Sequence, residues 1–218
     1  MKLHELFEST ERSVLSLRGP LKDHFDGSVF VINEKLTSLK GSPSTVTGEF
    51  KCSFNDLENL SFAPETVGGS FSCTDNQLVN LVGGPKHVGG EFFCGRNELE
   101  SLEGSPETVG EDFYCQKNKL KSLVGITKKV KDLCANGNQL TDLHNIHKLV
   151  DINGAADFLG NPITSHVLGL LMMPKLKEVF LDNRSVQKII NKHLQGGRDI
   201  FACQEELIEA GFEEFAQL

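Results

Sequence analysis

A repeat of 21 residues dominates this sequence. Phenylalanine stands at positions 50, 71, 92 and 113, so consecutive copies are 21 residues apart, and valine, cysteine, asparagine and two leucines recur at fixed offsets around it. The recurring cysteines are Cys52, Cys73, Cys94 and Cys115, and the recurring asparagines are Asn55, Asn76, Asn97, Asn118 and, in a copy one residue shorter, Asn138. Self-similarity at this period predicts a solenoid, because each unit can bury its apolar side only against its neighbours.

The Phe-x-Cys core of the repeat predicts a short strand. Side chains two residues apart on a strand point to one face, so phenylalanine and cysteine should both enter the core and stack on their counterparts in the next coil. A line of cysteines suits packing better than zinc, which requires four ligands around one point. In the shorter copy Ala135 takes the cysteine slot, so Cys134 should project from the sheet face and be the most reactive thiol.

The asparagines and glycines of the unit have structural explanations. An asparagine side chain both donates and accepts, so a stacked row of them can satisfy backbone groups where each coil leaves its strand. Gly-Gly pairs and prolines predict the tight return that so short a coil requires.

The unit V-x-G-x-F-x-C-x-x-N-x-L-x-x-L resembles the leucine-rich-repeat family over roughly residues 26–163. The resemblance implies an α/β repeat fold, a curved solenoid with parallel strands on its concave face, where such proteins usually bind other proteins. The Phe-x-Cys variant, together with the C-terminal QEELIEAGFEEFAQL, is also similar to small leucine-rich-repeat proteins of tailed bacteriophages. The phage resemblance indicates origin rather than activity.

The repeat divides the chain into three parts. Residues 1–25 are predicted as a short N-terminal cap, residues 26–163 as the repeats, and residues 164–218 as a terminal strand followed by a helical cap. The C-terminal part should contain a helix from Ser165 to Met173, a strand near Val179, a helix opened by Ser185, and a helix after Asp199 with Ile200, Cys203, Leu207 and Ile208 inward. These helices would cap the solenoid end; a separate effector or dimerisation module is the alternative.

Composition excludes several classes of function. The formal charge of −8 argues against a nucleic-acid partner, which would require clustered lysine and arginine. No apolar run approaches the roughly 18 residues of a membrane span, and no secretory signal opens the chain. The cysteine spacing lacks the usual zinc pattern and favours a reducing cytoplasm, the host cytoplasm if the protein is phage-encoded. We find no catalytic, cofactor-binding or metal-ligating motif and therefore expect no enzyme and no cofactor.

The residue between phenylalanine and cysteine in each unit should face outward and form the partner-binding surface. This row comprises Phe30, Lys51, Ser72, Phe93, Tyr114 and Cys134. The adjacent aromatic residues Phe93 and Tyr114 on a solvent-exposed sheet face indicate a binding patch. Carboxylates would line one edge of it (Glu49, Glu91, Asp112, Asp132), with Arg96, Gln116 and Lys117 on the other side. The plainer alternative is that the two rings only stack on each other.

The sequence therefore favours a non-enzymatic protein-binding module that engages a protein, such as a host protein, through its concave sheet face. The alternative is a structural or assembly protein that self-associates through its C-terminal helical region, so homo-oligomerisation stays open.

Overall fold

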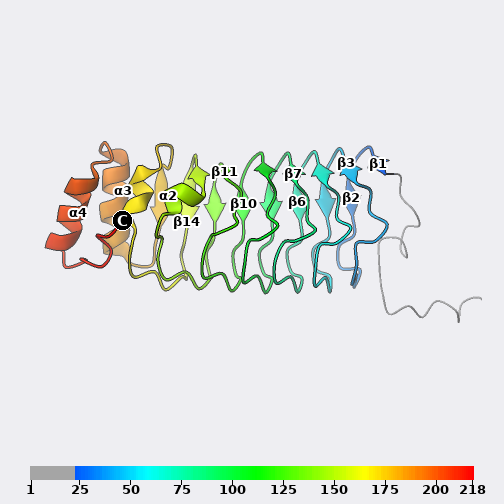
Figure 1. The fold of residues 1–218 in the computed structure, drawn as a ribbon, viewed down its shortest axis with the longest axis horizontal. Coiled ribbons are helices and arrows are strands. Elements are labelled where there is room, and N and C mark those ends of the chain that lie inside the picture. The colour runs from blue at the N-terminus through cyan, green and yellow to red at the C-terminus, as the bar shows by residue number, and fades with distance from the viewer. Residues whose placement is uncertain (1–22) are drawn as a thin grey trace, which may run out of the picture.

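The described residues wind into a parallel-strand β-solenoid. The computed structural model describes residues 23–218, and successive coils stack along the long axis of the molecule, from β1 at one end to α4 at the other (Figure 1). The cap predicted for residues 1–25 lies almost entirely outside the described residues.

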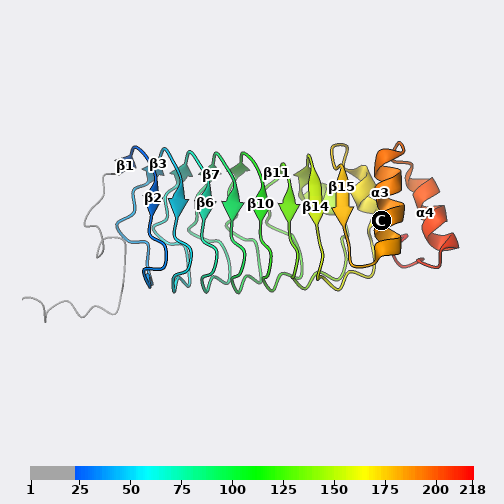
Figure 2. The ribbon, with the colours of Figure 1, turned by 180° about the vertical axis from the view of Figure 1, so that it is seen from behind.

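A larger parallel sheet forms one side of the solenoid, in the order β15-β14-β12-β10-β8-β6-β4-β2. Figure 2 shows these strands in one row, with β15 next to α3. In chain order the strands are β2 (Val29–Phe30), β4 (Phe50–Lys51), β6 (Phe71–Ser72), β8 (Phe92–Phe93), β10 (Phe113–Tyr114), β12 (Leu133–Cys134), β14 (Ala155–Asp157) and β15 (Glu178–Phe180). Each strand pairs in parallel with that of the next coil, so the predicted solenoid and its final strand near Val179 are both present.

A second row of strands was not predicted. It consists of β1 (His24–Phe25), β3 (Thr45–Val46), β5 (Thr66–Val67), β7 (His87–Val88) and β9 (Thr108–Val109), continued by the separate pair β11 (Lys129–Val130) and β13 (Asp151–Ile152). In most coils the buried valine that precedes each core phenylalanine by four residues lies in this row. The described coils return through turns, and no helix occurs among them before α2 (Ile146–Leu149), so the repeating unit is a β coil rather than an α/β one.

The first glycine of the Gly-Gly pair lies between the two strands of a coil, and close contact between coils explains it. A Cβ added at Gly89 would lie 2.1 Å from the Gly68 carbonyl oxygen, and one added at Gly110 would lie 2.0 Å from the Gly89 oxygen. The explanation from a tight return was therefore wrong for these residues, because it is the neighbouring backbone that excludes a side chain. The return itself uses other glycines with positive φ, such as Gly104 at 85°.

The core consists of stacked rows of identical side chains. The rings of Phe50 and Phe71 lie 5.7 Å apart, those of Phe71 and Phe92 5.6 Å, and those of Phe92 and Phe113 5.2 Å. All four are fully buried, as are the recurring cysteines and most of the leucines on the return side. Each coil therefore contributes the same apolar set, and only its neighbours cover it.

The asparagines form a continuous hydrogen-bonded ladder. Asn76 Nδ2 donates to the Cys73 carbonyl of its own coil and to the Cys52 carbonyl of the preceding coil, both at 3.0 Å. Its Oδ1 accepts from the Leu57 backbone N–H at 3.1 Å. The same pattern recurs at Asn55, Asn97, Asn118, Asn138 and Asn161. Every ladder residue thus joins two coils through backbone groups that lie outside the strands.

The C-terminal residues after the last coil are helical. The predicted helix from Ser165 to Met173 is replaced by a shorter 3-10 helix, η2 (Leu168–Met172). Ser165 itself forms an isolated β-bridge with Asp142. Asn183, rather than Ser185, caps α3 (Arg184–Gln195) by accepting from the Val186 N–H. Asp199 caps α4 (Ile200–Glu209) as predicted. Cys203 and Leu207 of α4 are buried, but Ile208 is 46% exposed, so its inward placement was wrong.

Helix α3 lies against the edge strand β15 and satisfies its backbone through side chains. Asn191 Oδ1 accepts from the Val179 N–H at 2.8 Å, and Asn191 Nδ2 donates to the Val179 carbonyl at 2.9 Å. Gln187 Oε1 accepts from the Leu181 N–H at 2.9 Å. These amides take the place of a neighbouring strand, so this end of the sheet offers fewer free groups for strand addition.

Candidate partner-binding face

The solvent-facing row of the larger sheet runs through the residues predicted for it. Strand pairing places Phe30 beside Lys51, Lys51 beside Ser72, Ser72 beside Phe93, Phe93 beside Tyr114, and Tyr114 beside Cys134. The row continues to Asp157 and Phe180. Its members are not equally accessible, since Ser72 is only 8% exposed whereas Phe30 is 45% exposed.

Phe93 and Tyr114 stack near the middle of this row. Their ring centroids are 4.7 Å apart and the ring planes are 8° from parallel. The separation is close to the ~4.8 Å spacing between strands, so the ring planes stand across the long axis of the solenoid. One face of each ring is covered by the other ring, and both side chains stay half-buried. The stack accounts for part of their apolar area but leaves the outer ring faces and edges accessible.

The hydroxyl of Tyr114 is tied to the acidic edge. It donates to Asp112 Oδ2 at 3.1 Å, and Asp112 Oδ1 accepts from the Asp132 backbone N–H at 3.1 Å. Burial, the hydrogen bond to Asp112 and the negative charges of Asp112 and Glu91 raise the pKa of Tyr114 to about 12. The phenol is therefore a neutral donor at physiological pH, in a negative local field.

The other predicted site residues lie around this stack with distinct partners. Lys51 pairs with Glu49 at 2.8 Å and lies over the Phe30 ring, 5.3 Å from its centroid. The Arg96 guanidinium is bound to Asp75 at 2.6 Å and so belongs to the turn beyond the sheet. These two cations are thus held by carboxylates next to them.

Gln116 and Lys117 follow Tyr114 along the chain. The Gln116 side chain lies over Gly95, where an added Cβ would meet its amide at 2.7 Å. Lys117 is exposed and has a left-handed backbone, with φ at 55°. Gln116 therefore belongs to the surface beside the stack, and Lys117 lies at its margin.

The cysteine thiols differ in burial according to whether they lie in the core row or on the sheet face. All six are free. Cys52, Cys73 and Cys94 donate through Sγ to carbonyl oxygens of the next coil at 3.4 Å, and burial raises the pKa of these thiols and of Cys115. Cys134 is only half-buried on the sheet face, and its pKa is raised mainly by that partial burial. The core thiols are therefore protonated packing groups.

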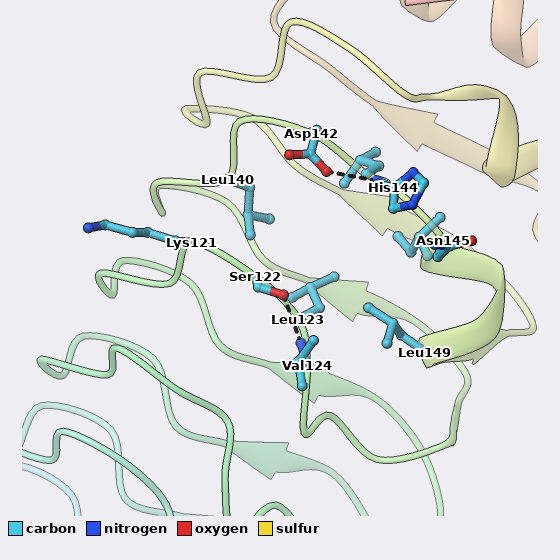
Figure 3. A pocket seen from close by; sticks show the side chains of 11 residues that line it. Lys121, Ser122, Leu123, Val124, Leu140, Asp142, His144, Asn145 and Leu149 are labelled. Carbon is cyan, nitrogen blue, oxygen red and sulfur yellow. Dashed lines mark hydrogen bonds between the residues drawn. The ribbon is translucent and has the colours of Figure 1, made fainter. Parts of the chain in front are cut away.

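A cavity of about 340 Å³ opens on the opposite, return side of the solenoid (Figure 3). Aliphatic side chains such as Leu123 and Leu149 line it, together with polar groups of two consecutive returns. Ser122 Oγ accepts from the Val124 N–H at 3.1 Å, and Asp142 Oδ1 accepts from the His144 backbone N–H at 2.9 Å. Ser122 and Asp142 therefore stabilise their own turns, and Nδ1 of the His144 ring lies 3.1 Å from the Leu218 carbonyl oxygen.

No family model, curated protein or solved structure matches this chain. Within residues 23–218, no group of three or more histidine, cysteine, aspartate or glutamate side chains is arranged to hold a metal ion. In the same range no helix has the length and apolar character that a membrane crossing demands.

Two residues of the sheet face were missed from the sequence. Asp157 and Phe180 continue the solvent-facing row beyond Cys134, because Ala156 and Phe158 occupy the inward slots on either side of Asp157. The signal was present in the spacing, since Phe158 and Asn161 stand three residues apart like Cys94 and Asn97. The longer coil before them hid the register.

Proposed function

We propose that this protein is a non-enzymatic binding module of the leucine-rich-repeat type, which holds a protein partner on the face of its larger sheet. The stacked pair of Phe93 and Tyr114 carries the proposal. Large aromatic side chains on a solvent-facing strand row are costly to leave uncovered, and aromatic anchors contribute much of the energy of protein interfaces. A partner would cover the outer ring faces and edges that the mutual stack leaves accessible.

The architecture supports this role. Rows of identical core side chains and the asparagine ladder hold neighbouring strands in fixed register, so the residues of the sheet face are presented on a rigid support. We extend the proposal to a concave sheet face, a cytoplasmic location and a phage origin, for which the sequence resemblance is the basis. The six free thiols agree with a reducing compartment.

Affinity capture with matched variants tests the proposal. Immobilised wild type, Phe93→Ala/Tyr114→Ala and Phe62→Ala would be exposed to bacterial lysate after circular dichroism shows that all three are folded. Phe62 is 61% exposed and belongs to a return segment, so it controls for the loss of an exposed ring. We expect a protein that the wild type and Phe62→Ala retain and the double variant loses. Equal capture by all three would contradict a site on the sheet face.

A second candidate function is self-association through the C-terminal helices. Phe201 is 83% exposed and Ile208 46% exposed on α4, the outermost element at that end (Figure 1). An assembly protein could bury these side chains against a second copy. Light scattering on wild type and Phe201→Ala/Ile208→Ala decides: a dimer that survives dilution and is lost in the variant would favour this function over the first.

A further inference from the structure

We infer that the partner presents an arginine side chain from a basic segment, and that this side chain lies over Cys134, with its guanidinium against Tyr114 and the carboxylates of Asp132 and Asp157. The inference rests on the proposed function and specifies the chemistry of the partner. It is argued from the register of the sheet face, the orientation of the rings and the distribution of charge.

The strand register places a small side chain, that of Cys134, beside the aromatic stack. Cys134 follows Tyr114 in the solvent-facing row, and Asp157 follows Cys134. One face of the Tyr114 ring is covered by Phe93, and because the ring planes stand across the solenoid axis, its other face is directed toward the coil of Cys134. The small thiol leaves that ring face open along the row.

Charge on this part of the face has one sign. From the coil of Phe92 to that of Phe180, the solvent-facing slots of the strands and of the residues flanking them contain six carboxylates and no lysine or arginine. These carboxylates are Glu91, Asp112, Asp132, Asp157, Glu178 and Asp182. Two cations near this part of the face are already paired, Lys51 with Glu49 and Arg96 with Asp75.

Among the described residues, the carboxylates nearest the open ring face form no direct ion pair, although Lys131, which pairs with Glu111 at 3.3 Å, also interacts electrostatically with Asp112 and Asp132. Asp132 Oδ1 accepts from the Ala155 N–H at 2.7 Å, and Asp157 accepts from Asn136 Nδ2 at 3.0 Å and from the Leu159 N–H at 2.9 Å. Within residues 23–218, neither aspartate forms an ion pair with lysine, arginine or histidine. A carboxylate has about four acceptor positions, so both keep capacity for further donors while being held in place by the backbone.

A guanidinium brings five N–H donors in one plane, stacks on an aromatic face and pairs with carboxylates. An ammonium group offers the charge without the plane, so arginine fits this surface better than lysine.

Peptide binding tests the inference. The probe is a short fluorescein-labelled peptide of glycine, serine and arginine, compared by fluorescence anisotropy with the same peptide carrying lysine or uncharged citrulline at the arginine positions. We expect the arginine peptide to bind the wild type about threefold more tightly than the lysine peptide, and the citrulline peptide to bind much more weakly. Equal binding of the arginine and lysine peptides would overturn the preference for a planar cation.

Variants locate the site. Asp132→Asn/Asp157→Asn keeps the acceptors for the backbone N–H groups and should lower the affinity for the arginine peptide about tenfold. Glu58→Gln/Glu103→Gln removes the same charge from exposed return segments and should change binding less than about twofold. Tyr114→Leu, which keeps an apolar group but removes the ring, should weaken binding of the arginine peptide more than binding of the lysine peptide, because a guanidinium stacks on the ring as well as being attracted to it.

Two further results would overturn the inference: equal losses in the two charge variants, which would indicate attraction to net charge, or wild-type affinity in Asp132→Asn/Asp157→Asn. The proposed function fails separately. If capture of a protein requires Phe93 and Tyr114 but the arginine peptide does not bind, the sheet face remains the docking site. In that case only the inference that the partner presents an arginine is wrong.

Discussion

Replacement of one ladder asparagine tests how the coils are held together, and Asn97→Ala is the clearest case. Asn97 is 6% exposed, and its side chain donates to the Cys73, Cys94 and Gly95 carbonyls at 3.0, 3.1 and 3.3 Å and accepts from the Leu78 N–H at 3.1 Å. Alanine removes all four contacts, which amount to about three hydrogen bonds because Nδ2 has two hydrogens to share among three carbonyls. Each hydrogen bond is worth about 1 kcal/mol net, and a buried group left without any partner adds about 1–3 kcal/mol.

The neighbouring ladder residues limit the damage. The Cys73 carbonyl keeps the donor from Asn76, and the Cys94 carbonyl keeps the donor from Asn118. Only the Leu78 N–H loses its partner completely. We therefore expect Asn97→Ala to lower the free energy of unfolding by about 4 kcal/mol.

Urea denaturation followed by far-UV circular dichroism would measure this loss. Asn59→Ala is the matched control, because Asn59 is exposed and makes one local bond, to the Ser61 N–H at 3.0 Å. The control should lose less than about 1 kcal/mol. If the two variants were destabilised equally, the ladder would not be what joins the coils, and the reasoning would be refuted.

Three further predictions concern the coil contact, the sheet face and the sheet edge. Gly89→Ala should destabilise by about 1–3 kcal/mol and lower the thermal midpoint, since its Cβ would lie 2.1 Å from the Gly68 oxygen; an unchanged midpoint would mean that the coils can separate there. Iodoacetamide should label Cys134 before any core thiol, and mass spectrometry of Cys134→Ser should then show no early product; early labelling of Cys52 would contradict the register. Asn191→Ala should cost about 1–3 kcal/mol and promote association through the exposed edge of β15, detected by light scattering, whereas Lys188→Ala, on an exposed position of the same helix, should do neither.

The sequence predicted which side chains of each repeat face inward, but it did not predict the second row of strands or the residues that continue the solvent-facing row beyond the last regular copy. Period and spacing were enough to place Phe92 and Cys94 inward and Phe93 outward, because alternation on a strand depends only on neighbouring positions. The second row of strands was missed because each of its members has a single recurring apolar residue, the valine, whereas the Phe-x-Cys core has two apolar residues at strand spacing.

Contacts between distant residues were beyond the sequence. The role of Gly89 follows from the proximity of the Gly68 carbonyl in another coil, which no local pattern encodes. The capping of β15 by Asn191 likewise depends on how α3 lies against the sheet. On the binding face, the aromatic pair was predicted from spacing, but the uninterrupted acidic surface beyond it required the register of β14 and β15.

Site-specific photo-crosslinking tests the central claim most directly. A benzophenone amino acid would replace Phe93, Phe62 or Phe201, three positions that sample the sheet face, a return segment and α4. After illumination in lysate, a protein binding to the sheet face should give a discrete heavier band from position 93 and none from position 62 or 201. A band from position 201 alone, with the mass of two copies of this chain, would contradict the claim and place the interaction at the C-terminal helices.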